Sequence, residues 1–246
     1  MYIDRTFLKQ NAKQAIAESR FKILFVAMVF LLLMYALNLF AQNLSGYAEF
    51  AARYTEKLME GETILRFSWP QVEPYAWVLV LCIILMRILM RAGCTSYFLL
   101  SSRREPAGFK NLLDGFYFPV KVAVMEVLKY AVILCGAVFF LFPGILFFYM
   151  FRLSLFVLFD NPEMGPVGCL GESARLMSGR KWELFLLDLS FAGWYIFSYF
   201  FALTGYPVLD VWVYPYTGLT YAGYYNSLIG WQPGQTPPDP ADTGWR

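Results

Sequence analysis

The sequence predicts an all-α, polytopic integral membrane protein with about six transmembrane helices and short amphipathic helices at the membrane surface. Of its 246 residues, 59% are hydrophobic and 15% are charged. A soluble domain is about 45–50% apolar and about 25% charged, so this composition suits a lipid environment. Long apolar runs alternate with short polar segments, and Lys and Arg gather in every second polar segment, as in multi-pass membrane proteins.

Composition also excludes several classes of function. The net charge is only +2 and no basic stripe occurs, so we expect no nucleic-acid partner. The chain has no histidine, which removes the commonest zinc ligand and every Ser-His or Cys-His nucleophile. No two of the four cysteines form a C-x-x-C pair, and we expect them to be buried apolar side chains. We therefore predict no catalytic residue, no metal, no cofactor and no enzyme activity.

Residues 1–22 read as a basic amphipathic helix. Its apolar residues recur at helical spacing, at Phe7, Leu8, Ala12, Ala15 and Ile16. Five basic side chains occupy other positions: Arg5, Lys9, Lys13, Arg20 and Lys22. We expect this helix to lie on lipid headgroups, with docking to a partner protein as the alternative.

The first two spans are expected near residues 23–42 and 75–100. The run 23–42 is too long for the apolar part of a signal peptide, so it predicts an uncleaved anchor. The intervening segment, 43–74, is acidic and is expected outside the cell, with a short amphipathic helix over 47–59. A basic segment, 101–121, follows the second span and is expected to be cytoplasmic.

Residues 122–159 are almost all apolar and are interrupted by Pro143-Gly144. They could form one long kinked helix or two short spans, 122–142 and 144–159, joined by a tight turn. The basic residues after 160 favour the hairpin, because it returns the chain to the cytoplasmic side. Residues 166–178 then predict an amphipathic helix parallel to the membrane.

The last two spans are expected near 182–203 and 208–229, the second being interrupted by Pro215. Gly218 and Ala222 form a small-xxx-small pattern that favours close helix packing. Residues 230–246 are polar and proline-rich, which predicts a disordered cytoplasmic tail. In this arrangement both termini are cytoplasmic, and residues 23–229 form one transmembrane domain.

Several strings of residues carry a resemblance to a known family. They are L-K-Q-N-A-K at 8–13, P-G-I at 143–145, D-N-P at 160–162, E-S-A-R-L-M-S-G-R-K-W at 172–182 and L-F-L-L-D-L-S-F-A-G-W at 184–194. Together they resemble an uncharacterised family of bacterial multi-pass membrane proteins, domain of unknown function 975. The resemblance implies an integral membrane protein with several spans, and it implies no activity.

Ionisable residues inside apolar runs are the functional candidates, because placing them in lipid is costly. The set is Arg87, Arg91, Glu126, Lys129, Arg152, Asp188 and Asp210. Arg87 and Arg91 are expected to extend to the inner membrane surface, or else to meet a buried partner or a lipid phosphate. Glu126 and Lys129 are three residues apart and are expected to pair.

Asp188 is too short to reach the membrane surface, so it is expected to face protein. The candidate partners are phenols of the sixth span, arginines of the second span and backbone donors freed near Pro215. Two roles remain open for Asp188. It could belong to a structural stripe of hydrogen-bonded side chains, or it could line a polar path for a small solute.

The leading functional hypothesis is a non-enzymatic accessory or envelope-homeostasis protein of the bacterial cell membrane. It would act on membrane lipid or on a membrane partner, and a homo-oligomer is a further expectation. The alternatives are a small transporter or channel using Asp188, Arg87 and Arg91, and a lipid-modifying enzyme. A cavity reaching Asp188 would favour transport, whereas a filled helical core would favour the accessory role.

Overall fold

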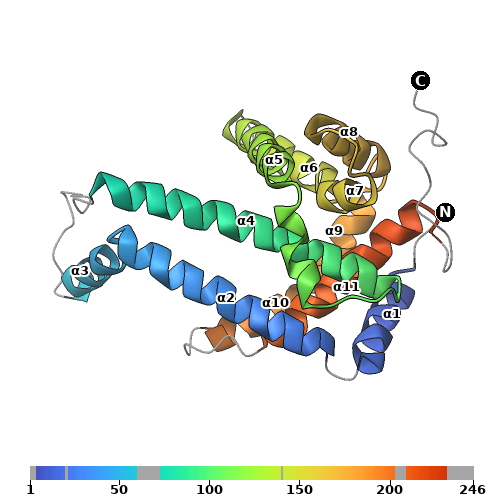
Figure 1. Ribbon diagram of the computed structural model, residues 1–246, viewed down its shortest axis with the longest axis horizontal. Coiled ribbons are helices and arrows are strands. Elements are labelled where there is room, and N and C mark those ends of the chain that lie inside the picture. The colour runs from blue at the N-terminus through green and yellow to red at the C-terminus, as the bar shows by residue number, and fades with distance from the viewer. Residues whose placement is uncertain (1–3, 20–21, 60–72, 140, 203–208, 232–246) are drawn as a thin grey trace. The chain divides into compact units, whose positions relative to one another are not determined.

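The computed structural model describes residues 4–19, 22–59, 73–139, 141–202 and 209–231, and all regular elements in these ranges are helical (Figure 1). The helices are α1 (Arg5–Glu18), α2 (Lys22–Leu44), α3 (Tyr47–Met59), α4 (Pro74–Ser102), the 3-10 helix η1 (Phe109–Phe116), α5 (Pro119–Phe139), α6 (Leu141–Met150), α7 (Ser154–Asp160), α8 (Pro166–Leu176), α9 (Lys181–Leu189), α10 (Ala192–Ala202) and α11 (Asp210–Leu228). The predicted all-α class is confirmed. The expected tail, 230–246, lies almost entirely outside the described residues.

The chain divides into two compact units. One is Val29–Ile88, which contains most of α2, α3 and the first half of α4. The other combines Met1–Met28 with Leu89–Arg246 and contains every remaining helix. The predicted amphipathic helix over 47–59 is present as α3.

Fewer helices could cross a membrane than the six predicted. Three in the described residues are long and apolar enough, at Lys22–Leu44, Pro74–Ser102 and Phe142–Asp160. The pair α9 and α10, bent by 44°, would add a fourth if it counts as one span. The predicted spans 122–142 and 208–229 are not among them. Hydrophobic runs alone overestimate the number because they count tyrosine as apolar, and α11 contains five tyrosines and has eleven residues buried against protein.

Residues 122–159 form a hairpin and not one kinked helix. Helices α5 and α6 pack directly on each other. A Cβ on Gly136 would lie 2.7 Å from Cδ2 of Phe147, and a Cβ on Gly144 would lie 2.8 Å from Cβ of Ala137. Pro143 lies in the first turn of α6, where a missing N–H costs no helical hydrogen bond.

Helix α1 is present as predicted, but its apolar face is covered by protein. Leu8, Ala12 and Ile16 are all 3% exposed, and α1 packs on α11. Lys9 also faces the bundle, since its Nζ donates to the Ser190 carbonyl at 3.0 Å and lies 4.3 Å from the centre of the Phe191 ring. The side of α1 that carries Leu8, Ala12 and Ile16 therefore packs on protein and stabilises the bundle.

The break between α6 and α7 is closed by a side chain from α8. The Ser173 hydroxyl donates to the Met150 carbonyl at 2.8 Å and accepts from the Leu153 N–H at 3.2 Å. Both backbone groups lose helical partners at the break, so one hydroxyl satisfies two groups that would be costly to bury unpaired. This contact explains the serine of the E-S-A-R string.

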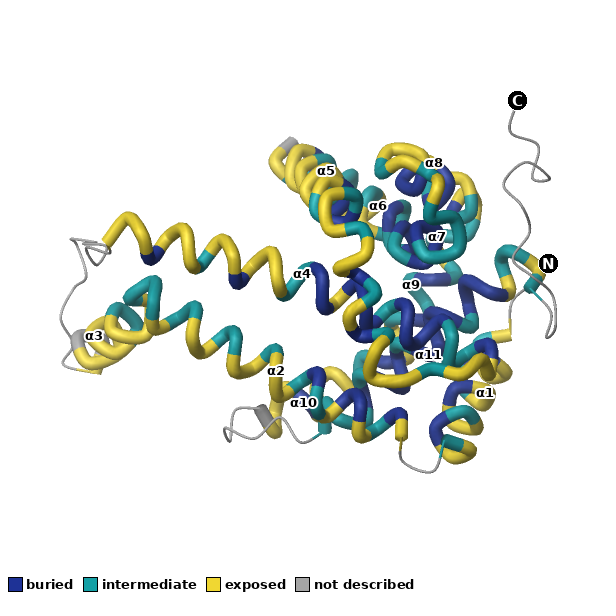
Figure 2. The backbone as a smooth tube through the Cα atoms, viewed as in Figure 1, coloured by how far each residue is buried: buried dark blue, intermediate teal, exposed yellow. Residues whose placement is uncertain are grey.

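Burial divides α4 into two halves (Figure 2). Between residues 75 and 88 most side chains are exposed and apolar, which suits a lipid-facing helix. From residue 92 to residue 99 nearly all are buried. Gly218 of α11 packs on this buried half, where an added Cβ would lie 2.4 Å from the Phe98 ring, so the predicted small-residue contact is made with α4. Against expectation, Cys82 and Cys135 are exposed, while Cys94 and Cys169 are buried.

Candidate functional site

Asp188 faces protein, as its sequence context predicts. It lies at the end of α9 and accepts a hydrogen bond from the Tyr221 hydroxyl of α11. The Arg152 guanidinium is 4.0 Å from the same carboxylate oxygen, and its Cζ lies 4.7 Å above the Tyr221 ring. The predicted partnership with a phenol of the last helix is confirmed. The arginine partner comes from the α6–α7 break and not from the second span.

Three other predicted residues of this unit, Glu126, Lys129 and Asp210, are paired as well. Glu126 and Lys129 form an ion pair on α5, with side-chain exposures of 5% and 14%. Asp210 accepts a hydrogen bond from the Ser198 hydroxyl of α10. Each of these carboxylates has its partner within the bundle, so the helices can hold them in an apolar environment.

Arg87 and Arg91 have different surroundings. In the unit formed by Val29–Ile88, Arg87 Nη1 donates to Oδ1 of Asn38 at 3.2 Å, so its partner is an amide and not a carboxylate. Arg91 is exposed and belongs to the other unit. The amide explains how Arg87 is tolerated in an apolar run, because a hydrogen-bond acceptor is already present beside it.

We expect neutralisation of Arg91 to affect lipid association more than neutralisation of Arg87. Arg91→Gln should lower the retention of anionic phospholipid in purified protein, because an exposed guanidinium near a span end can reach phosphate. Arg87→Gln, the matched control, keeps a side chain that can bond Asn38. Lipid co-purifying with each variant would be measured by mass spectrometry. Equal retention in the wild type, both variants and the double variant would show that the charges are incidental.

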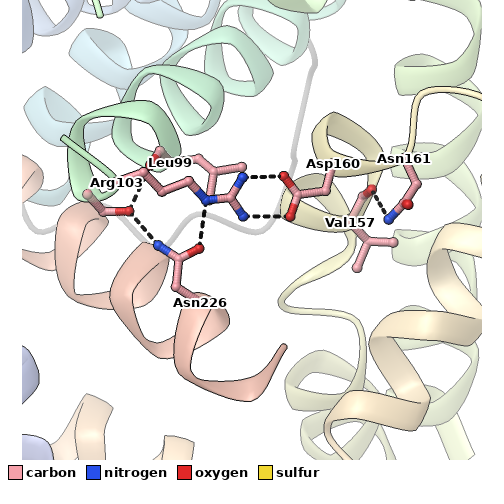
Figure 3. Close-up of polar contacts among 7 residues, drawn as sticks. Leu99, Arg103, Val157, Asp160, Asn161 and Asn226 are labelled. Carbon is pink, nitrogen blue, oxygen red and sulfur yellow. Dashed lines mark hydrogen bonds and ion pairs between the residues drawn. The ribbon is translucent and has the colours of Figure 1, made fainter. Parts of the chain in front are cut away.

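A further polar cluster was not predicted. Arg103, at the end of α4, makes two hydrogen bonds of 2.7 Å to both carboxylate oxygens of Asp160 (Figure 3). Its Nε donates to Oδ1 of Asn226 at 3.0 Å, and the Asn226 amide donates to the Ser102 hydroxyl at 2.9 Å. The Arg103 and Asp160 side chains are only 3% and 4% exposed. Three helices, α4, α7 and α11, are thereby tied together through one guanidinium.

The D-N-P string belongs to this cluster. Asp160 binds Arg103, and the Asn161 N–H closes the last turn of α7 through a 2.9 Å bond to the Val157 carbonyl. The Pro162 carbonyl accepts a 2.6 Å bond from Nζ of Lys121 at the start of α5. The only available signal was the resemblance itself, since nothing in the local pattern identifies Arg103 as the partner of Asp160.

A cleft of about 440 Å³ lies beside this cluster, between α1, the end of α4 and α11. One wall is apolar and includes Leu8, Ala12 and Leu219. The polar lining includes Asn11, Arg103, Arg104, Asn226, Ser227 and Trp231. Asp188 does not line it. Arg104 is itself exposed, and its Nη2 lies 3.4 Å from the Glu18 carboxylate of α1.

In the described residues, no three His, Cys, Asp or Glu side chains gather as metal ligands. The cleft presents apolar side chains together with the cationic groups of Arg103 and Arg104, at one end of the helical bundle.

Comparison with known proteins agrees with the resemblance. Residues 143–231 match the model of a family described as "Protein of unknown function (DUF975)". The matched segment includes the D-N-P string, the E-S-A-R string and all of α7 to α11, while the string at 8–13 lies outside it. No curated protein and no solved structure gives a significant match. The segment 143–231, which contains α8 and the helices around Asp188, is therefore similar to this family of unknown function.

Proposed function

We propose that this chain is a multi-pass protein of the bacterial cell membrane that works without catalysis, as an accessory or envelope-homeostasis protein. It acts on a membrane partner or lipid from the end of the bundle where α1, the end of α4 and the cleft lie. The observation that supports this most is the packing around Asp188. A transport path through Asp188 would need a free carboxylate, whereas this carboxylate is engaged by Tyr221 and Arg152.

The cleft itself supports an interaction role. Binding surfaces commonly combine apolar walls with a few placed polar groups, and this cleft has both. The Arg103 pair forms a rigid floor beside it, because three helices converge on one buried guanidinium.

Two measurements test the proposal. Purified protein in proteoliposomes should conduct no potassium, sodium or protons above protein-free vesicles, and flux that Asp188→Asn abolishes would favour a transporter. In cells lacking the native gene, Ala15→Trp should fail to restore resistance to envelope stress, because the indole fills the cleft. Ala17→Trp, on the exposed side of the same helix, is the matched control and should restore it.

We also expect both termini to face the cytoplasm. The hairpin of α5 and α6 supports this, because it brings the basic segment after residue 160 back to the side of α1 and the basic segment 101–121. Reporter fusions after Arg246 should be active only as cytoplasmic reporters, and insertions near Glu60 only as external ones. An external reporter signal at Arg246 would require an odd number of crossings and would contradict the proposed topology.

A further inference from the structure

The connection between α4 and α5 contains η1, which is clamped onto α4 by two glycines. A Cβ on Gly93 would lie 2.0 Å from the Leu112 carbonyl oxygen, and a Cβ on Gly115 would lie 2.0 Å from the Leu89 carbonyl oxygen. Backbone therefore meets backbone at two points. Because these contacts leave no room for a side chain, η1 is fixed beside residues 89–93 of α4.

Most of the exposed side chains of η1 are apolar, which is unusual for a helix in water. Of its three polar side chains, Lys110 is exposed, whereas the other two are bonded together: the Ser96 hydroxyl of α4 and the Asn111 amide both donate to Asp114, at 2.6 and 3.0 Å. Apart from Lys110, its outward face is apolar and aromatic. We call this face the η1 surface; its residues are Phe109, Leu113, Phe116 and Tyr117, with exposures of 45%, 56%, 38% and 77%.

The position of η1 along α4 matches the boundary of a bilayer. Leu89 and Gly93 follow Tyr75 by 14 and 18 residues, which is about 21 and 27 Å at the rise of an α-helix. A hydrocarbon core is about 30 Å thick. On α4 the run of exposed apolar residues ends at Met86, just before this level, and the exposed Arg91 lies within it. Aromatic and arginine side chains are enriched at such boundaries.

We infer that the η1 surface is a lipid-binding surface, inserted at the boundary between headgroups and acyl chains of the leaflet nearest the C-terminal end of α4. The inference rests on the proposed membrane insertion and adds a partner for one defined face. Lipid is the partner that fits, because the face is continuous in sequence with the exposed apolar residues at the start of α5, such as Val120 and Val124. An exposed apolar and aromatic face with a single lysine beside it suits the boundary between acyl chains and headgroups.

The close contacts at Gly93 and Gly115 fix the position of the η1 surface relative to α4. Most interfacial helices bind reversibly, whereas η1 has a fixed depth because its backbone is locked to α4. Phe109 also meets Phe25 of α2 edge-on, with ring centres 5.6 Å apart. The protein therefore presents a permanent wedge that occupies space in one leaflet.

Spin labels on single introduced cysteines test the inference. The background carries Cys82→Ala and Cys135→Ala, which remove the exposed thiols. Cys94 and Cys169 are buried, and burial raises the pKa of the Cys169 thiol to about 11, so it reacts slowly with thiol reagents. Labels go at Leu113→Cys and Tyr117→Cys on the η1 surface. Glu105→Cys, exposed in the same connection, is the water control, and Leu134→Cys, exposed on α5, is the lipid control.

The labelled protein is placed in lipid nanodiscs, and collision rates with oxygen and with a water-soluble nickel complex are compared. Labels at Leu113 and Tyr117 should collide with oxygen several-fold more, relative to nickel, than the label at Glu105. Nickel access at both η1 positions equal to that at Glu105, with Leu134 still protected, would overturn the inference and leave the insertion of the α5–α6 hairpin standing. Nickel access at Leu134 as well would overturn both the inference and the proposed insertion of this hairpin. Protection of η1 that disappears when each disc holds one copy would instead show that a second copy covers the surface.

Discussion

Arg103→Ala should lower the free energy of unfolding by about 3–5 kcal/mol, the largest effect expected of any single substitution in this chain. Removing the guanidinium leaves the Asp160 carboxylate, which is 4% exposed, without either of its 2.7 Å partners. The Asn226 side-chain oxygen loses its bond from Arg103 too, so this guanidinium no longer joins α7 to α4 and α11. Reversible unfolding in mixed micelles, with increasing denaturing detergent, would measure the loss.

Two further variants separate the charge pair from its packing. Arg103→Lys keeps the charge but cannot form the two parallel bonds, and it should recover only part of the stability. Arg103→Met combined with Asp160→Leu removes both charges and should be clearly more stable than Arg103→Ala, because no buried charge is left alone. A loss below about 0.5 kcal/mol for Arg103→Ala, as for a surface site, would show that water reaches the pair and that it ties nothing together.

Asp188→Leu should produce the second largest loss. It leaves the Tyr221 hydroxyl and the Arg152 guanidinium without their acceptor, and one unsatisfied buried group costs about 1–3 kcal/mol, more when it is charged. Asp188→Asn keeps an oxygen that can accept from Tyr221, so it should fold nearly normally. The same micelle unfolding experiment measures both variants.

The matched control changes the other partner of the hydrogen bond between Tyr221 and Asp188. Tyr221→Phe removes the donor and keeps the ring beneath Arg152, so it should lose less stability than Asp188→Leu. If Asp188→Leu proved as stable as Asp188→Asn, the carboxylate would not stabilise the bundle. Normal folding of Asp188→Asn with complete loss of complementation would point instead to ion or proton coupling.

Several features followed directly from local sequence. Apolar runs predicted α2 and α4 to within two residues at each end, and the Glu126–Lys129 pair followed from its spacing on one helix. The depth of Asp188 predicted that it faces protein, because a short carboxylate cannot reach water from there. These features depend on residues close together in the chain, so the sequence pattern carries them.

The number of spans was overestimated because that prediction, too, rested on local sequence alone. A run of apolar letters does not reveal whether its helix is broken or buried against protein. The 182–203 run is two helices bent by 44°, and α11 is largely buried in the bundle. Likewise, the apolar stripe of α1 predicted an apolar contact, but hydropathy cannot tell lipid from the face of α11 that covers it.

The sequence by itself therefore determined the all-α class, the longest apolar helices, the family resemblance of residues 143–231 and the need of each buried charge for a partner. Only the tertiary structure decided which partner each charge has. Arg103 meets Asp160 and Asn226 across 57 and 123 positions of sequence, and the clamp of η1 on α4 depends on the absence of Cβ atoms at two glycines 22 positions apart (93 and 115). The physical reason is that every buried polar group needs a hydrogen-bond partner, and this need can be recognised from the local sequence. Which group becomes the partner depends on how the helices pack, and packing is a property of the whole bundle.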